Sequence, residues 1–151
     1  MKEYPWGKGT PKIVQDTAAN DSSKLFAVPA GKIWRVKSVY GQLLSTATVG
    51  NRVLIIEVND GAGGVVWVLR SANVPASTKA TALLDAGSMT YGTTVAACPL
   101  LDSLNPGIAV YNHLPIDVLP AGYTIKVWDA AAIDAAADDL TVVLHYVEYD
   151  A

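Results

Sequence analysis

The stretch that decides the fold runs from Arg52 to Leu69 and reads RVLIIEV, then NDGAGG, then VVWVL. Two runs rich in valine and isoleucine flank a segment of Asn, Asp and Gly, residues that tolerate the backbone angles of tight turns. The stretch therefore predicts a β-hairpin with strands over residues 52–58 and 65–69. Both strands are apolar at consecutive positions, and such a strand is usually covered on both faces. We expect a second subunit to supply the second cover.

Similar strand patterns occur in the sequence both before and after this hairpin. Short apolar runs bounded by turn residues predict further strands over residues 24–28, 32–45, 79–84, 108–111, 116–119, 123–129 and 140–149. Residues 91–98 are either irregular or a weak strand, and residues 130–139 are mostly a loop. No long stretch keeps the 3.6-residue period of an amphipathic helix. The chain is therefore all-β, a sandwich or a barrel, and we expect an antiparallel, jelly-roll-like β-sandwich.

The long run over residues 32–45 predicts one buried face. Its apolar side chains share one parity and its basic side chains share the other: Trp34, Val36, Tyr40 and Leu44 against Arg35 and Lys37. This alternation fits a half-buried antiparallel strand. Gly41 interrupts the run, and we expect a bulge or a bend there.

Two short segments repeat the same turn chemistry. Val28-Pro29-Ala30-Gly31 leads into the strand over residues 32–45, and Leu119-Pro120-Ala121-Gly122 leads into the strand over residues 123–129. In both, proline fixes its φ angle and glycine permits the turn. The match predicts two corners at equivalent positions in two halves of a sandwich, with chance similarity of turn residues as the alternative.

Residues 1–22 predict an extended N-terminal arm, and residues 23–151 predict the β-sandwich domain. Proline and glycine punctuate positions 5–11, which disfavours a helix, while residues 12–15 could pair with a sheet edge. Large aromatic side chains are costly to leave in water, and aromatic residues are enriched at interface hot spots. The candidate assembly contacts are therefore two aromatic and two basic residues of this arm: Tyr4, Trp6, Lys8 and Lys12. The alternative is an unattached terminus.

Composition excludes several classes of protein. The chain of 151 residues has a net charge of −3, which argues against a general nucleic-acid binder. Charged residues make up 17%, against about 25% in typical domains, which suggests that partners bury some surface. No run approaches the roughly 18 apolar residues of a membrane span, and the first residues lack the apolar core of a signal peptide. We expect a soluble product made in the cytosol.

The residues that usually carry chemistry are few and scattered. A single cysteine, Cys98, excludes an intramolecular disulfide framework, and His113 and His145 lack metal-ligand spacing. Four neighbouring aspartates, Asp129, Asp134, Asp138 and Asp139, lack the order of a calcium loop, so a solvated loop is the expectation. We expect no catalytic residues, no metal site and no cofactor.

Five aromatic residues suggest an alternative function. Tyr4, Trp6, Trp34, Trp67 and Trp128 could line a carbohydrate-binding face. Core or interface packing is the default for strand tryptophans. A carbohydrate-binding module therefore stays open as the alternative function.

The sequence patterns of the two corners and of the strands after them resemble those of a family of structural proteins. The segments Val28–Val36 and Leu119–Val127, followed by the closing run Leu140–Tyr149, resemble the small β-sandwich proteins of tailed-bacteriophage virions, such as capsid decoration or cement proteins. The resemblance implies a symmetric homo-oligomer, often a trimer, that is fixed on the virion surface and is not an enzyme. Its partners would be the major capsid protein or other virion proteins, after synthesis in the host cytoplasm. The alternative above would then belong to a tail or fibre component.

Overall fold

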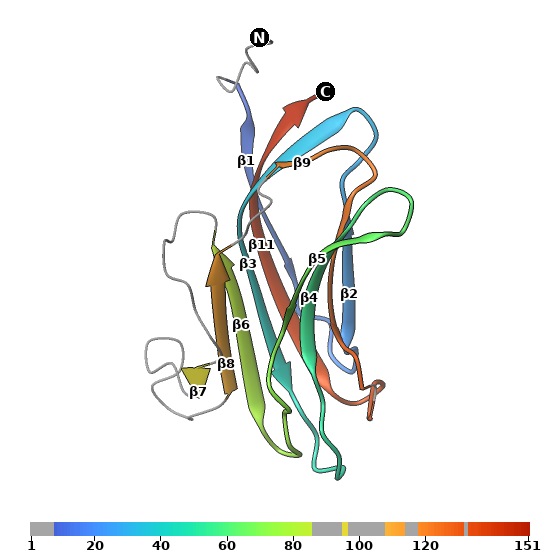
Figure 1. Ribbon diagram of the computed structural model, residues 1–151, viewed down its shortest axis with the longest axis vertical. Coiled ribbons are helices and arrows are strands. Elements are labelled where there is room, and N and C mark those ends of the chain that lie inside the picture. The colour runs from blue at the N-terminus through green and yellow to red at the C-terminus, as the bar shows by residue number, and fades with distance from the viewer. Residues whose placement is uncertain (1–7, 86–94, 97–107, 114–117, 132) are drawn as a thin grey trace.

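The structure is a computed structural model that describes residues 8–85, 95–96, 108–113, 118–131 and 133–151. Within these residues every regular element is a β-strand, and the strands form two packed sheets (Figure 1). The strands are β1 (Thr10–Asp16), β2 (Ser23–Ala27), β3 (Lys32–Leu44), β4 (Leu54–Asn59), β5 (Val65–Arg70), β6 (Lys79–Asp85), β7 (Val95–Ala96), β8 (Ile108–His113), β9 (Val118–Leu119), β10 (Thr124–Asp129) and β11 (Asp139–Asp150).

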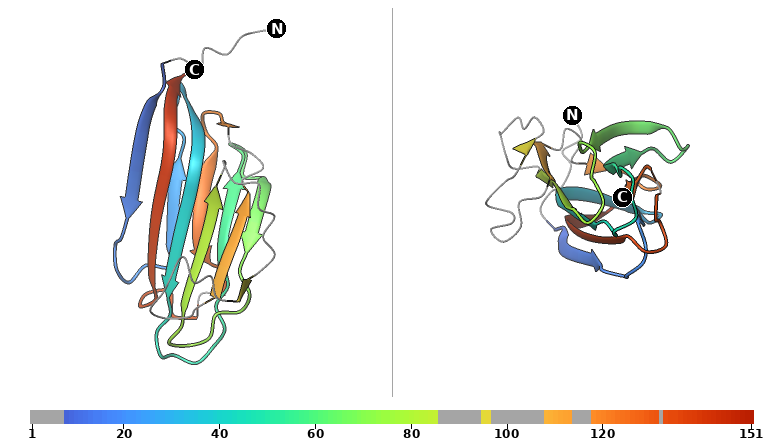
Figure 2. Two further views of the ribbon diagram at one scale, coloured as in Figure 1. Left: turned by 90° about the vertical axis from the view of Figure 1, so that its left-hand side faces the viewer. Right: turned by 90° about the horizontal axis from the view of Figure 1, so that it is seen from below.

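The two sheets differ in size. The large sheet has the order β1-β11-β3-β6-β8-β7, with β9 paired to one end of β3, and the small sheet has the order β2-β10-β4-β5. Every strand pair is antiparallel except β6 with β8. Figure 2 shows the strands of the large sheet side by side in its left view.

The pairing pattern is that of a jelly roll. If β7, β8 and β9 are set aside, the first strand pairs with the last and the pairing continues inward: β1 with β11, β2 with β10, β3 with β6 and β4 with β5. This is one long hairpin rolled into two four-stranded sheets, the eight-strand arrangement of a jelly roll. The predicted all-β, jelly-roll-like sandwich is therefore confirmed, with β7–β9 inserted between the sixth and seventh strands of the roll.

The first strand of the roll comes from the expected arm. Residues 10–16 pair with β11 along their whole length, from Thr10 opposite Glu148 to Asp16 opposite Val142. The predicted edge pairing of residues 12–15 is confirmed. Among the described arm residues, Lys8, Gly9 and the connection after Asp16 lie outside the strands.

The prediction for β3 was half wrong. Trp34 and Val36 are buried as predicted, but the buried parity then changes to Val39, Gly41 and Leu43. Tyr40 is therefore only half-buried, and Leu44 is exposed. The cause is a bulge at Lys37: Val36 pairs with Tyr146 and Ser38 with His145, so Lys37 has no partner in register. One extra residue moves all later side chains to the other face.

Gly41 does not form the predicted bulge, because it pairs regularly with Val142 and Ala82. Its role is to let the sheets approach one another. A Cβ atom at position 41 would lie 3.0 Å from Val127 Cγ1 on β10 of the opposite sheet.

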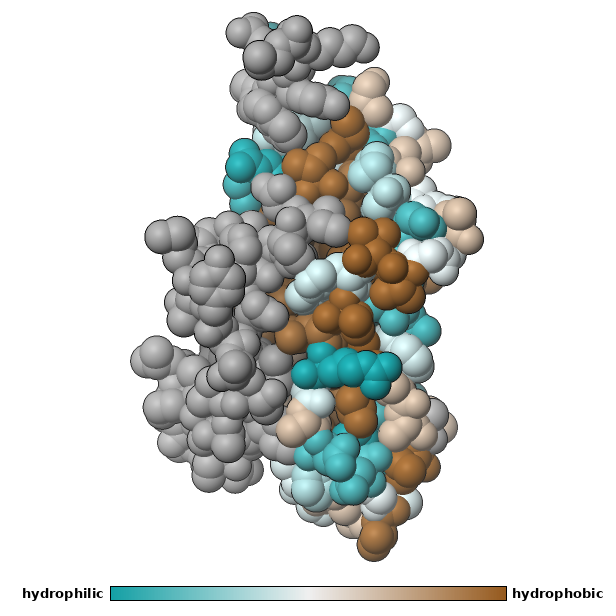
Figure 3. Space-filling model, in the orientation of Figure 1, coloured by the Kyte–Doolittle hydropathy of each residue, from teal (hydrophilic) through white to brown (hydrophobic). Residues whose placement is uncertain are grey.

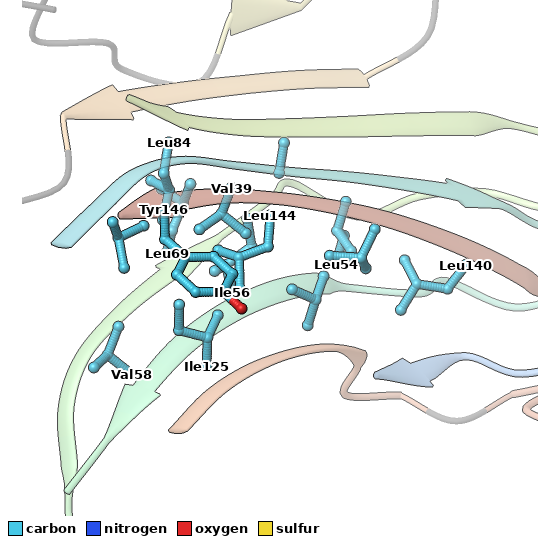
Figure 4. Packing of buried hydrophobic residues seen from close by; sticks show 14 of the residues in the cluster. Val39, Leu54, Ile56, Val58, Leu69, Leu84, Ile125, Leu140, Leu144 and Tyr146 are labelled. Carbon is cyan, nitrogen blue, oxygen red and sulfur yellow. The ribbon is translucent and has the colours of Figure 1, made fainter. Parts of the chain in front are cut away.

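The core lies between the inner faces of the two sheets (Figure 4). Leu54, Ile55 and Ile56 of β4 are each at most 1% exposed, so the chain itself buries both parities of this strand. The expected cover from a second subunit is therefore not needed on β4. The outward side chains of β5 remain exposed: Val65, Val66 and Val68.

The two predicted corners are equivalent in space. Lys32 N donates to Pro29 O at 3.1 Å and Tyr123 N to Pro120 O at 3.2 Å, and the third residue of each turn is a glycine with positive φ. The corners lie side by side, because Val28 N donates to Tyr123 O. The strand before each corner pairs with the strand after the other, β2 with β10 and β9 with β3.

Candidate assembly surfaces

The structure describes two of the four predicted assembly contacts. Tyr4 and Trp6 lie outside the described residues. Lys8 is exposed. Lys12 Nζ donates to Glu148 Oε1 on β11 at 2.8 Å, although the lysine side chain is 42% exposed. Lys12 is therefore engaged within its own chain.

Gly9 fixes where the arm meets the sandwich. It lies against Val147 and Tyr149 of β11, so closely that a Cβ atom at position 9 would overlap both side chains. Successive side chains of a strand point to opposite faces, so Val147 and Tyr149 face outward while Tyr146 is buried. Gly9 therefore lies beside the outward side chains of β11, where glycine is the residue that fits without moving them.

Glu148 joins three strands at this end of the sandwich. Besides the bond from Lys12 on β1, it accepts a hydrogen bond from Trp34 Nε1 on β3 at 3.0 Å. These two bonds, that of Lys12 first, hold the pKa of Glu148 below its usual value. The Trp34 ring packs on Tyr146, with ring centroids 4.2 Å apart.

The described tryptophans do not share an exposed platform. Trp34 is buried, and Trp67 is half-buried and packs against the core. Trp128 lies on the outer face of the small sheet, where Lys126 Nζ sits 3.9 Å from its ring centroid.

A buried ion pair closes the end of the sandwich opposite the corners. Arg52 and Asp138 are both fully buried, and Arg52 Nε donates to Asp138 Oδ2 at 2.8 Å. The remaining guanidinium hydrogens reach Asp138 Oδ1, the carbonyls of Thr48 and Gly50, and Thr46 Oγ1. The guanidinium thus makes five hydrogen bonds, which offsets the cost of burying its charge.

The expectation of a solvated aspartate loop was wrong, because each of the four side chains fixes a neighbouring segment. Asp138 also accepts from Thr46 N, and Asp134 accepts from the hydroxyls of Thr46 and Thr48 at 2.6 and 2.8 Å. These hydroxyl bonds, that of Thr46 first, lower the pKa of Asp134. Asp129 accepts from Val53 N and Asp139 from Asn20 N.

Sequence reasoning missed the buried Lys24 on the inner side of β2. Its Nζ donates to Ala18 O and lies 3.0 Å from Asp16 Oδ1 and 3.1 Å from Asp21 Oδ2. Burial opposes the charge, but the hydrogen bonds that Lys24 donates to Asp16 and Asp21 hold the pKa of Lys24 above its usual value. Lys24 therefore fastens the β1–β2 connection. A lysine in an otherwise apolar strand was the available signal.

The two histidines are separated on the large sheet. The register runs from His145 on β11 through Ser38 and Asp85 to His113 on β8, so two strands stand between them. Three strand spacings of about 4.8 Å therefore separate their backbones. The described residues contain no group of three His, Cys, Asp or Glu side chains that could hold a metal, and Cys98 lies outside them. No helix in the described part of the chain is long and apolar enough to cross a membrane.

Exposed apolar side chains gather on β5. Val65, Val66 and Val68 are 59%, 40% and 43% exposed, and together with the exposed Arg70 they form what we call the β5 surface. Figure 3 shows hydrophobic residues in the middle of its view, where β5 runs in Figure 1. Across the small sheet, Val68 continues a row with Glu57, Lys126 and Leu25, the last of which is 63% exposed.

The chain matches no family model and no curated protein. Among solved structures, a Bacillus endospore appendage from a family of disulfide-linked pili is 12% identical, with a TM-score of 0.34 over 95% of this chain and 87% of that chain. The VP2 subviral particle of infectious bursal disease virus is 14% identical, with a TM-score of 0.33 over 93% of this chain and 37% of that chain. The Agl-KA catalytic domain is 12% identical, with a TM-score of 0.30 over 95% and 26%. These are distant resemblances in β-sandwich architecture, and this chain spans 37% of the VP2 chain and 26% of the Agl-KA chain.

Proposed function

We propose that the protein is a non-enzymatic structural subunit of a tailed-phage virion, in the role of a capsid decoration or cement protein. The observation that carries the proposal is that, among the described side chains, the buried charged ones hold the fold together while several large apolar ones stay exposed. The buried charged side chains form ion pairs that hold loops and strands together, as in the Arg52–Asp138 pair and around Lys24. Large apolar side chains remain exposed on several strands and loops, and three of them lie together on β5.

The mechanism is mechanical. A jelly roll presents exposed apolar side chains on its small sheet, and β1, which follows the first residues of the arm, lies at the edge of its large sheet. Burial of apolar area contributes about 25 cal/mol per Å², before the entropic costs of association are subtracted. The arm brings two aromatic residues, Tyr4 and Trp6, to the surface of a neighbouring subunit or of the capsid.

Mass spectrometry of purified particles of the virus that encodes the chain tests the location. We expect the protein to remain with the particles through density-gradient purification. Its absence from them would contradict the proposal.

Removal of residues 1–8 tests the arm. This deletion keeps Gly9 and the whole of β1, so the sandwich is expected to fold with an unchanged midpoint of thermal unfolding while attachment to particles is lost. The full-length variant Tyr4→Ser/Trp6→Ser is the matched control for chain length and is expected to lose attachment as well. If both proteins sediment with particles like the wild type, the arm is not the anchor.

Carbohydrate binding is the second candidate. Trp128 is the one described tryptophan on an outer sheet face, and Lys126 lies over its ring. A glycan array probed with the free protein should remain blank. Specific binding that Trp128→Ala abolishes would favour this alternative instead.

A further inference from the structure

The ends of the two sheets are protected to different degrees. An unpaired sheet edge invites pairing with another chain, and natural proteins discourage it with proline, lysine or a charge that points inward. β1 carries Pro11 and Lys12 at the edge of the large sheet. β2, at one edge of the small sheet, points the charged Lys24 inward.

β5, at the other edge of the small sheet, lacks these features. Its sequence is VVWVLR, with neither proline nor lysine and with no charge directed inward. A bulge interrupts its pairing with β4 only at the first residues, whereas Trp67–Arg70 follow regular register against Val58–Ile55. Among the sheet edges whose side chains the structure describes, β5 is therefore the one open to a further strand.

We propose that β5 pairs in antiparallel fashion with β5 of a second copy of this chain. A two-fold axis through Val68 places this residue opposite Val68 of the second copy and places Val66 opposite Arg70. The two small sheets then join into one continuous sheet. The exposed valines of both copies form one apolar strip on the outer face, and their contact across the new strand pair removes part of their area from water.

Charge favours the antiparallel orientation. Arg70 lies at one end of β5, and the hairpin with Asp60 lies at the other, where Asp60 Oδ1 accepts hydrogen bonds from Ala62 N and Gly64 N. An antiparallel pair brings Arg70 of each copy toward Asp60 of the other. A parallel pair would instead place the two Arg70 side chains together, which is unfavourable.

The pairing goes beyond the proposed function, because it concerns the free protein and requires no virion. It also predicts a two-fold contact, whereas the resemblance to decoration proteins implies a trimer. A test on the purified protein therefore fails or succeeds independently of any test with particles.

Light scattering after size-exclusion chromatography provides this test. At micromolar concentration we expect the wild type to have twice the mass of one chain and Val68→Lys to have half the wild-type mass. Ile13→Lys is the matched control, because it places lysine at a 69% exposed apolar position of β1 and should leave the dimer intact. A monomeric or trimeric wild type, or equal masses for the two variants, would overturn the proposal.

A cysteine variant keeps the test independent of that lysine substitution. Directly opposite residues of an antiparallel pair have Cα atoms about 4.5–5.5 Å apart, which suits a disulfide. Val68→Cys should therefore form a covalent dimer on mild oxidation, and Ile13→Cys should not. Equal cross-linking of the two variants, or none in Val68→Cys, would contradict a two-fold axis at Val68.

Discussion

Gly41 of β3 and Val127 of β10 face one another across the sandwich so closely that a methyl group at position 41 would lie 3.0 Å from Val127 Cγ1 and fit only if Val127 moved. Gly41→Ala should therefore lower the free energy of unfolding by about 1–3 kcal/mol, the usual cost of overpacking a core. Urea denaturation measures the change. Gly41→Ala/Val127→Ala should recover part of the loss relative to Val127→Ala alone, because the smaller side chain makes room for the new methyl group. Additive effects of the two substitutions would contradict steric contact.

The Arg52–Asp138 pair is expected to respond strongly to the removal of one partner. Arg52→Met leaves a carboxylate that is fully buried, and such a change typically costs about 3–5 kcal/mol. Asp138→Leu should have a similar effect for the opposite reason. Chemical denaturation of the double variant should give a loss well below the sum of the single losses. A loss below about 1 kcal/mol for Arg52→Met would mean that the pair is solvated.

Lys24 provides a contrast, because its carboxylate partners can return to water. Asp16 and Asp21 keep 40% and 46% of their side-chain area exposed, while the Lys24 side chain keeps 1%. Lys24→Met should therefore cost only about 1–2 kcal/mol, mostly through the lost hydrogen bond to Ala18 O. The exposed neighbour Leu25 supplies the control Leu25→Gln, which should be within about 0.5 kcal/mol of the wild type.

Glu148 should contribute to the loss of stability in acid. Its hydrogen bonds from Lys12 and Trp34 lower its pKa in the folded state from the usual 4.5. Its contribution is therefore complete above pH 4.5 and disappears as the pH falls through the lowered folded-state pKa. Thermal unfolding of Glu148→Gln from pH 7 to pH 3 should show a shallower decline than the wild type. Parallel curves would show that Glu148 adds nothing to acid sensitivity.

The sequence predicted the strands well, because strand signals are local. The hairpin at residues 59–64, the strands on either side of it and the two Pro-Ala-Gly corners all depend on residues adjacent in the chain. The bulge at Lys37 was missed because no glycine or proline marks it, and the wrong parity of Tyr40 and Leu44 followed from that single residue. A bulge is decided by the register with β11, which lies more than a hundred residues away.

The polar contacts were harder to predict from the sequence, because they also join residues that lie far apart in the chain. Asp138 gave no sign that it pairs with Arg52, because 86 residues separate them. Lys12 was correctly read as part of a strand at a sheet edge, but its bond to Glu148 depends on the closing of the roll. Of the predicted contacts, Tyr4 and Trp6 lie outside the described residues, so their role stays a prediction.

The pairing of the first strand with the last has a consequence for folding kinetics. Lys12 and Glu148 are joined across 136 residues, and β11 fills the position between β1 and β3 in the large sheet. During synthesis, β3 can pair with β6 earlier, but β1 has no sheet partner and β3 lacks its second neighbour until β11 is made. Non-local pairing of this kind slows folding, to milliseconds or seconds in all-β domains. An unfinished chain therefore carries two unsatisfied strand edges, which are the surfaces on which a chaperone or an aggregating neighbour would act.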